Sequence, residues 1–250
     1  MSSPSWDYIA KLVCIGDSGC GKSSLTIRLC EGRFSPTTMS PSASSSAPAS
    51  LLPARRLSRR CHRHQGRRRR PPEPPRNPPA AATGPQKHMK LSLWDTAGQE
   101  TYKSVTRSYF RGASGALLVF DLCRRQTFLH VTDWLNDLRQ IAEPDIVVVL
   151  VGNKADLTLD SADGENKREV TRDEAEDWAR RNGVLEYVET SAKSGENVEN
   201  AFMRVSERIY QNIQAGRYDL NDRRSGVKGP SAGGSRNVAL KRPPQNSGCC

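Results

Sequence analysis

A glycine-rich stretch near the start of the chain has the residue types that bind phosphate. It reads Gly16-Asp17-Ser18-Gly19-Cys20-Gly21-Lys22-Ser23 and matches the pattern G-x-x-x-x-G-K-[ST]. The glycines let successive backbone N–H groups converge on phosphate oxygens, and the N-terminus of a following helix adds positive potential. Lys22 would reach the β- and γ-phosphates of a nucleotide, and the Ser23 hydroxyl would ligate Mg²⁺. The alternative interpretation is an ordinary glycine-rich turn between a strand and a helix.

A second motif, Trp94-Asp95-Thr96-Ala97-Gly98-Gln99-Glu100, follows an apolar strand-like run. An aspartate at a strand end, here Asp95, can hold Mg²⁺ through water, and the Gly98 amide can sense a γ-phosphate. Gln99 can orient the attacking water and is the candidate catalytic residue. On its own D-x-x-G is usually a turn, but after a phosphate loop it indicates nucleotide hydrolysis.

Two later motifs predict a pocket for the base. Gly152-Asn153-Lys154-Ala155-Asp156 ends an apolar run, and Thr190-Ser191-Ala192-Lys193 ends another. The Asp156 carboxylate can accept two N–H groups from the guanine edge, which adenine cannot supply. Asn153 and the aliphatic stem of Lys154 would complete the pocket, and the Ala192 N–H would meet the guanine carbonyl. Each tetrapeptide alone could be a cap or a turn, but four motifs in order favour a nucleotide site.

The elements that must position these motifs alternate along the chain. The hydrophobic pattern predicts strands over 8–15, 90–94, 115–121, 146–152 and 184–188, and helices over 23–31, 127–141, 171–182 and 198–215. Such alternation predicts an α/β fold, with a mostly parallel sheet covered by helices on both faces. Ligands of such sheets bind in the loops at the carboxyl ends of the strands. The longest apolar run, 146–151, is far too short to span a membrane.

The positive charge of the chain is local. Residues 35–86 hold ten Arg against one acid, which gives +9, and residues 216–250 hold seven Lys or Arg against two acids, which gives +5. Subtracting both from the formal net charge of +11 leaves −3 for the rest, which argues against nucleic-acid binding by the body of the chain. The seven cysteines show neither metal-ligand nor disulfide-framework spacing and suggest reduced thiols.

Two segments lie outside the alternating pattern. Residues 35–86 contain eleven of the sixteen prolines, no aromatic residue and no usable periodicity, and we expect them to be disordered. Residues 216–250 are rich in Gly, Ser, Pro and Asn and predict a flexible tail. One domain built from residues 6–34 and 87–215 is therefore expected, interrupted by the first segment and followed by the second.

The four motifs resemble those of the Ras-like small GTPases, and among them the Rab branch. Rab-like stretches include residues 90–94, 108–113 and 117–121, and the subgroup acting at the Golgi and in endosomal recycling is most similar. The resemblance implies a P-loop NTPase fold, three-layered α/β/α with a six-stranded sheet, and a site for GTP or GDP with Mg²⁺. By the same resemblance, Phe34 would pack against the guanine edge and Ser24 would touch the α-phosphate. The implied function is a GTP-hydrolysing switch in vesicle traffic, slow without an activating protein.

The last two residues, Cys249 and Cys250, also fit this family. Rab proteins ending in Cys-Cys carry two geranylgeranyl groups, and two lipid chains give stable membrane attachment. The basic tail would add attraction to an anionic leaflet. The resemblance thus implies the cytoplasmic face of Golgi or endosomal membranes, in exchange with the cytosol. Its implied partners are an exchange factor, a GTPase-activating protein, effectors, a prenylation escort protein and a GDP-dissociation inhibitor.

The chain departs from the family between the first helix and the second motif. The family has a switch I Thr followed by Ile-Gly and an edge strand, but residues 35–86 contain no Thr-Ile-Gly. Thr37 and Thr38 are nearby, and neither is assigned. It stays open whether the edge strand after switch I is present. Back-translation of residues 38–50 allows a shifted frame that encodes Asp-Val-Thr-Ile-Gly-Val-Glu-Phe-Gly-Ser-Arg-Ile, so we hypothesise a frame slip near Pro36 that ends by Lys87.

Three functions remain open from the sequence. The first is the cycling GTPase. The second is a nucleotide-binding protein with defective switching, because Mg²⁺ would lose a ligand and effectors would lose their usual surface without switch I. The third is contact with RNA or DNA through the Arg-rich segment, which would be nonspecific.

Overall fold

The computed structural model describes residues 6–34, 51–53, 87–96, 108–158, 167–220, 222 and 225–229. Its strands are β1 (Tyr8–Ile15), β2 (Leu51–Pro53), β3 (His88–Asp95), β4 (Gly115–Asp121), β5 (Val147–Asn153), β6 (Tyr187–Glu189) and β7 (Val227–Lys228). Its helices are α1 (Lys22–Glu31), α3 (Arg125–Leu129), α4 (Val131–Ile141), α5 (Arg172–Arg181) and α6 (Val198–Gln214), with a 3₁₀ turn η2 at Ala155–Leu157. Strands and helices alternate, as the hydrophobic pattern predicts.

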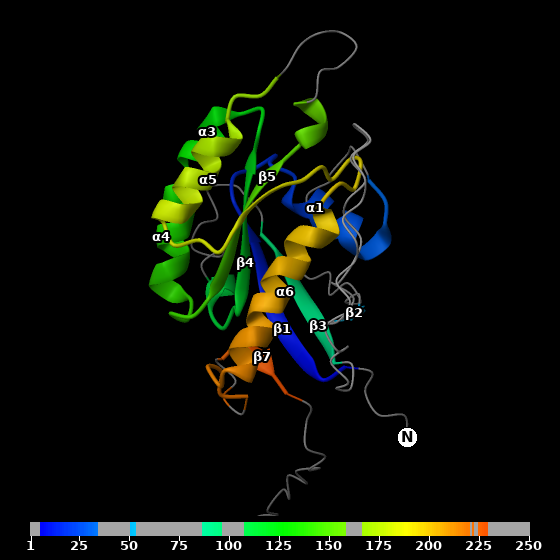
Figure 1. The fold of residues 1–250 in the computed structure, drawn as a ribbon, viewed down its shortest axis with the longest axis vertical. Helices are drawn as coiled ribbons and strands as arrows, with labels where there is room; N and C mark the ends of the chain where they lie inside the picture. Colours follow the sequence, from blue (N-terminus) through cyan, green and yellow to red (C-terminus); the bar gives the residue numbers. More distant parts are fainter. Residues whose placement is uncertain are drawn as a thin grey trace, which may run out of the picture.

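The sheet is mostly parallel, which confirms the predicted fold class. Its order is β2-β3-β1-β4-β5-β6, with β7 paired to β1. The pairs β1–β3, β1–β4, β4–β5 and β5–β6 are parallel, whereas β2–β3 and β1–β7 are antiparallel. Figure 1 shows α3, α4 and α5 along one side of this sheet and α1 and α6 on the other.

The core lies in two layers because the central strands are apolar on both faces. All seven residues of β4 are buried, and so are all seven of β5. Alternate residues such as Leu117 and Val119 pack toward Phe202 of α6, whereas Leu118 and Phe120 join a second cluster on the other face. That second cluster is completed by the following residues of α3, α4 and α5: Phe128, Trp134, Leu135, Leu138, Ala175 and Ala179. Burial on both faces is what holds parallel strands.

The predicted helix over 127–141 is two helices in the structure. α3 ends and α4 begins at His130, whose φ of −75° and ψ of −10° keep the chain near helical geometry. Because the backbone stays in the right-handed helical region, the hydrophobic period runs on through the break and conceals it. The last parallel strand is also shorter than predicted, since β6 begins only at Tyr187.

A short strand lies in the segment that the sequence predicts to be disordered. Leu51–Pro53 pairs antiparallel with β3, with Leu51 opposite Lys90 and Pro53 opposite His88. This differs from the expectation for residues 35–86 and gives the sheet an edge strand beyond β3. The open edge of β3 supplies unpaired N–H and C=O groups, which can bind an extended backbone of almost any sequence.

The expected flexible tail also contains ordered structure. β7 pairs with β1 so that Ala10 lies opposite Val227, and the Lys11 N–H donates to the Gly226 carbonyl (3.0 Å). The pairing is possible because β4 starts opposite Leu12 and leaves the first half of β1 open on that edge. Val227 is fully buried. The flexible-tail prediction therefore fails for residues 225–229, which belong to the sheet.

β7 lies at the end of the sheet opposite the loop between β1 and α1 (Figure 1). Because β1, β3, β4, β5 and β6 run parallel, the loops after β1, β5 and β6 lie at the same edge of the sheet as Asp95 at the end of β3. Over the described ranges, no helix combines the length and apolar character needed to cross a membrane.

Candidate functional site

The loop between β1 and α1 requires glycine at two crowded positions. Gly16 has a φ of 135°, and a Cβ built there would lie 2.0 Å from the Val119 carbonyl oxygen. Gly21 has a φ of 91°, and its Cβ would lie 2.3 Å from the Asn153 Nδ2 atom. A side chain at either position would clash with neighbouring strands as well as strain the backbone. The structure thus places the predicted phosphate loop tightly against β4 and β5.

Lys22 is buried at the start of α1 and folds back over this loop. Its Nζ donates to the carbonyl oxygens of Gly16 (2.9 Å) and Asp17 (2.7 Å). Burial lowers the pKa of Lys22, and the charges of nearby Asp95 and Asp17 partly oppose that effect. A largely desolvated ammonium held by two main-chain dipoles is well placed to receive a phosphate oxygen.

Ser23 and Asp95 meet beside Lys22. The Ser23 hydroxyl donates to Asp95 Oδ2, whereas Asp95 Oδ1 is buried and has no hydrogen-bond partner among the described residues. Burial raises the pKa of Asp95, and the Ser23 hydrogen bond opposes the rise. A buried carboxylate oxygen without a partner is costly unless a cation or donor meets it. This hydroxyl and carboxylate are the hard oxygen ligands that Mg²⁺ prefers, so the residues fit that ion.

Asn153, the last residue of β5, joins two loops at the carboxyl ends of the strands. Its Nδ2 donates to the Cys20 carbonyl oxygen in the phosphate loop (2.8 Å). Its Oδ1 accepts from the Thr190 hydroxyl (3.3 Å) and from the Ala192 N–H (3.2 Å). Asn153 itself is 1% exposed. One buried amide therefore holds the phosphate loop and the Thr190–Lys193 loop in a fixed relation.

Asp156 lies on η2, directly after β5, and is oriented by the neighbouring loop. Its Oδ1 accepts from the Ser191 hydroxyl at 2.6 Å. Lys154 is in the left-handed region, with a φ of 70°, and its Nζ forms an ion pair with Asp121 Oδ2 (2.6 Å). The structure thus brings the two predicted base-binding motifs into contact.

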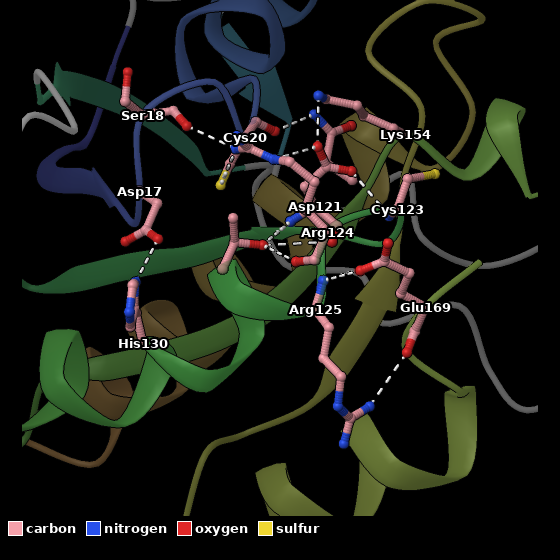
Figure 2. Close-up of polar contacts among 12 residues, drawn as sticks. Asp17, Ser18, Cys20, Asp121, Cys123, Arg124, Arg125, His130, Lys154 and Glu169 are labelled. Atoms are coloured by element: carbon pink, nitrogen blue, oxygen red, sulfur yellow. Dashed lines mark hydrogen bonds and ion pairs between the residues drawn. The ribbon is translucent and has the colours of Figure 1, made fainter. Parts of the chain in front are cut away.

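Asp121 and Arg124 connect this region to the phosphate loop and were missed by sequence reasoning. Asp121 is 1% exposed and pairs with both Lys154 and Arg124. Arg124 Nη2 also donates to the Ser18 carbonyl oxygen (2.7 Å) and lies 4.0 Å from the Cys20 sulfur. Figure 2 shows Arg124 and Lys154 converging on Asp121. An acid that ends a wholly apolar strand was the available signal, because such a carboxylate needs partners.

Asp17 turns away from the phosphate loop toward α4. Its carboxylate accepts from the Trp134 indole N–H (2.7 Å) and lies 2.7 Å from His130 Nδ1. Figure 2 shows the Asp17–His130 contact. The Asp17 side chain therefore anchors the loop, whereas its main-chain carbonyl receives Lys22.

The remaining predicted residues divide between described and undescribed parts of the chain. Ser24 lies in the first turn of α1, and Phe34 is 37% exposed at the end of the first described range. Lys193 follows Ala192, and its carbonyl accepts from Arg28. Gly98, Gln99, Thr37, Thr38, Cys249 and Cys250 lie outside the described residues.

A model of the Ras family matches residues 79–211, more than half of the chain. The matched segment includes β3 to α6 and therefore the Asp95, Asn153–Asp156 and Ser191–Lys193 positions. The phosphate loop precedes it in sequence. In the fold, however, β1 pairs with both β3 and β4, so the loop and the matched segment form one site.

Proposed function

The chain belongs to the Ras family, and we propose that it is a Rab-type switch that binds guanine nucleotides, hydrolyses GTP and regulates membrane traffic. Membership of the family makes it a small GTPase in general terms. The finer assignment, to vesicle traffic, is supported by the Rab-like stretches of the sequence. The Ras-family match does not distinguish this branch.

The observation that carries the nucleotide-binding function is the position of Asn153. It bridges the Cys20 carbonyl of the phosphate loop and the Ala192 N–H of the opposite loop, which sets phosphate and base contacts at a fixed separation. Asp156 is held by Ser191 in the same region. A carboxylate there would accept from the guanine N1–H and amino group, and adenine lacks this pair of donors. We therefore propose guanine specificity through Asp156 and Ala192.

Ser23 and Asp95 would hold Mg²⁺, as the unpartnered Asp95 oxygen suggests. The chemistry that Mg²⁺ would supply there is neutralisation of negative charge on the phosphate oxygens. Lys22 would bind the β- and γ-phosphates from the other side, and the loop amides would orient them. Gln99 is proposed to orient the attacking water.

The tail is proposed to attach the protein to membranes. Cys249 and Cys250 would carry two geranylgeranyl groups, added with an escort protein and shielded by a GDP-dissociation inhibitor when the protein leaves the membrane. The proposed location is the cytoplasmic face of Golgi or endosomal membranes. Intact-mass measurement after expression in a host with prenylation enzymes tests this, and an unmodified mass would refute it.

Nucleotide binding is tested by titrating mantGDP and mantGTP into the purified chain with Mg²⁺ and with EDTA. We expect GTP and GDP, but not ATP, to displace the fluorescent nucleotide, and Mg²⁺ to raise the affinity. Asp156→Ala should weaken GDP binding by at least about tenfold, because two base donors lose their acceptor. Asp177→Ala is the matched control, since Asp177 is exposed on α5 and pairs with Arg180. Equal competition by ATP and GTP would contradict the proposal.

A further inference from the structure

Arg28, on the outer part of α1, donates hydrogen bonds to three main-chain carbonyl oxygens. Nε donates to Ala192 (2.8 Å), Nη2 donates to Lys193, and Nη1 donates to Gly32 (2.6 Å). Two of these acceptors lie 164 and 165 residues away in the sequence. The side chain therefore joins the end of α1 to the loop that we propose binds the base.

The guanidinium group suits this task because its donors lie in one plane at fixed angles. Two of them meet the consecutive carbonyls of Ala192 and Lys193, which fixes the direction of the loop as well as its position. The aliphatic part of Arg28 also lies close to Gly195 of this loop, since a Cβ built at Gly195 would lie 3.5 Å from Arg28 Cδ. A lysine would supply a single point charge in place of this fork.

The loop is held from two directions. From β5, Asn153 Oδ1 accepts the Ala192 N–H, and Asp156 accepts the Ser191 hydroxyl. From α1, Arg28 holds the Ala192 carbonyl, which belongs to the peptide unit directly after that N–H. Because adjacent peptide planes share one Cα, fixing the carbonyl restricts the direction in which the N–H points.

The same side chain stabilises the end of α1. Gly32 caps the helix with a φ of 67°, and its N–H donates to the Arg28 carbonyl (3.0 Å), while its own carbonyl accepts from Arg28 Nη1. Phe34, two residues further on, is the last residue of this described range. One guanidinium group thus contacts both the end of α1, which precedes residues 35–86, and the base loop.

We propose that Arg28 is a positioning residue that fixes the peptide units around Ala192, so that the Ala192 N–H, which Asn153 Oδ1 accepts at 3.2 Å, is shared with the guanine carbonyl oxygen when the nucleotide binds. Arg28 would thereby couple this contact to the end of α1. The inference rests on the proposed guanine site. It predicts that Arg28 slows nucleotide release through the base loop, and that movement of the α1 end loosens the base contact.

The first measurement is the rate of mantGDP release from the full chain. We expect Arg28→Ala to speed release about tenfold to a hundredfold, the effect of losing hydrogen bonds from a charged donor. Arg28→Lys should fall between the wild type and Arg28→Ala. Arg204→Ala is the control. Arg204 is exposed on α6, where it pairs with Glu207 of the same helix and with Glu186, which precedes β6. Release at the wild-type rate from folded Arg28→Ala would overturn the proposal.

The second measurement distinguishes a specific effect of Arg28 on the Ala192–guanine contact from a general loosening of the fold. The affinities of GDP, 6-thio-GDP and IDP are compared by competition, because sulfur at position 6 is a poor acceptor and inosine lacks the amino group. In the wild type both replacements should weaken binding. In Arg28→Ala the preference for GDP over 6-thio-GDP should shrink at least about threefold, whereas the preference over IDP should change less than about twofold, since Asp156 remains on η2.

Equal weakening of all three nucleotides would show a purely structural role and overturn the proposal. If Arg28→Ala does not fold, Arg28→Lys provides the same comparison with a cation retained. A wild-type chain that binds no guanine nucleotide would overturn the proposed function and this inference together, whereas wild-type binding with unchanged ratios in the variants would overturn this inference alone.

Discussion

The indole N–H of Trp134 donates to the carboxylate of Asp17 at 2.7 Å, which ties helix α4 to the phosphate loop. The other carboxylate oxygen lies 2.7 Å from His130 Nδ1, at the junction of α3 and α4. Asp17 is 7% exposed, so its carboxylate is hydrogen-bonded mainly by protein groups rather than by water. The position of the loop is therefore set by the helix layer as well as by its own glycines.

Trp134→Phe removes one of these donors while keeping most of the aromatic volume. We expect the free energy of unfolding to fall by about 1.5–3 kcal/mol, the usual value for a hydrogen bond to a charged group. GDP release should also become several-fold faster, because the phosphate loop loses an anchor. Urea unfolding and mantGDP release measure the two effects. Trp178→Phe is the control, because that indole donates to the Thr132 hydroxyl in an exposed contact (3.2 Å), and equal effects in both variants would contradict the prediction.

Gly226 tests whether β7 is part of the domain. A Cβ at Gly226 would lie 2.5 Å from the Gly112 carbonyl oxygen, whereas a Cβ at Gly216 would meet no atom within 4 Å, and both glycines have a φ of 71°. Gly216→Ala should therefore lose stability only because alanine disfavours a positive φ. Gly226→Ala should lose this stability too, and also the stability lost to the clash with the Gly112 carbonyl. We expect Gly226→Ala to be less stable than Gly216→Ala by about 1–3 kcal/mol in urea unfolding.

Truncation gives an independent test of the same strand. Removing residues 230–250 should leave the unfolding free energy nearly unchanged, whereas removing 225–250 should lower it by about 1.5–3 kcal/mol, because the fully buried Val227 is lost while Tyr218 stays on the core. Equal stability of the two truncated chains would mean that β7 contributes nothing to the domain.

The proposed Mg²⁺ site at Asp95 predicts that the stability of the nucleotide-bound chain depends on Mg²⁺. Burial raises the pKa of Asp95, so the ionised carboxylate is destabilising unless a cation compensates it. In the presence of GDP, Mg²⁺ should raise the melting temperature of the wild type and should have little effect on Asp95→Asn. With EDTA, Asp95→Asn should melt at the wild-type temperature or above it, because it buries no charge. Asp177→Asn, an exposed acid on α5, should respond to Mg²⁺ as the wild type does.

Some parts of the site could be predicted because they depend on residues that are close together in the sequence. Gly16 and Gly21 are needed because β4 and Asn153 approach them closely, and Lys22 follows at the start of the helix. The strands were predictable because β4 and β5 are apolar on both faces and buried throughout. In each case the environment of a residue could be inferred from its chemical type: glycine where neighbouring atoms come close, and apolar residues where the strand is buried.

Two of the missed contacts have the main chain as their partner. Arg28 and Arg124 bind the carbonyl oxygens of Ala192 and Ser18, and a carbonyl looks the same at every position in a sequence. β7 was missed for a related reason. It is two residues long, so it has no periodicity, and its place is determined by the edge of β1 that β4 leaves open.

Cys14 provides a prediction about alkaline pH. Burial, with a smaller contribution from the charge of Asp95, raises the pKa of the Cys14 thiol from an ordinary value of 9.0 to about 12. At pH 8 only about one folded molecule in ten thousand would carry this thiolate. Iodoacetamide at pH 8 should therefore label the partly exposed Cys30 and Cys123 well before Cys14, as peptide mapping by mass spectrometry would show.

The raised pKa of Cys14 also makes the free energy of unfolding fall as the pH rises. The folded-state pKa lies above the unfolded value, so the stabilisation is complete below pH 9 and is lost between pH 9 and about 12. By pH 10 the loss from Cys14 alone is about 1.4 kcal/mol, which urea unfolding between pH 8 and pH 10 can resolve. Cys14→Ala should be less stable at pH 8 but should show a shallower decline. Cys123→Ala removes a partly exposed thiol whose pKa burial also raises, so it should make the slope shallower by less than Cys14→Ala does. A wild-type slope in Cys14→Ala would contradict the assignment.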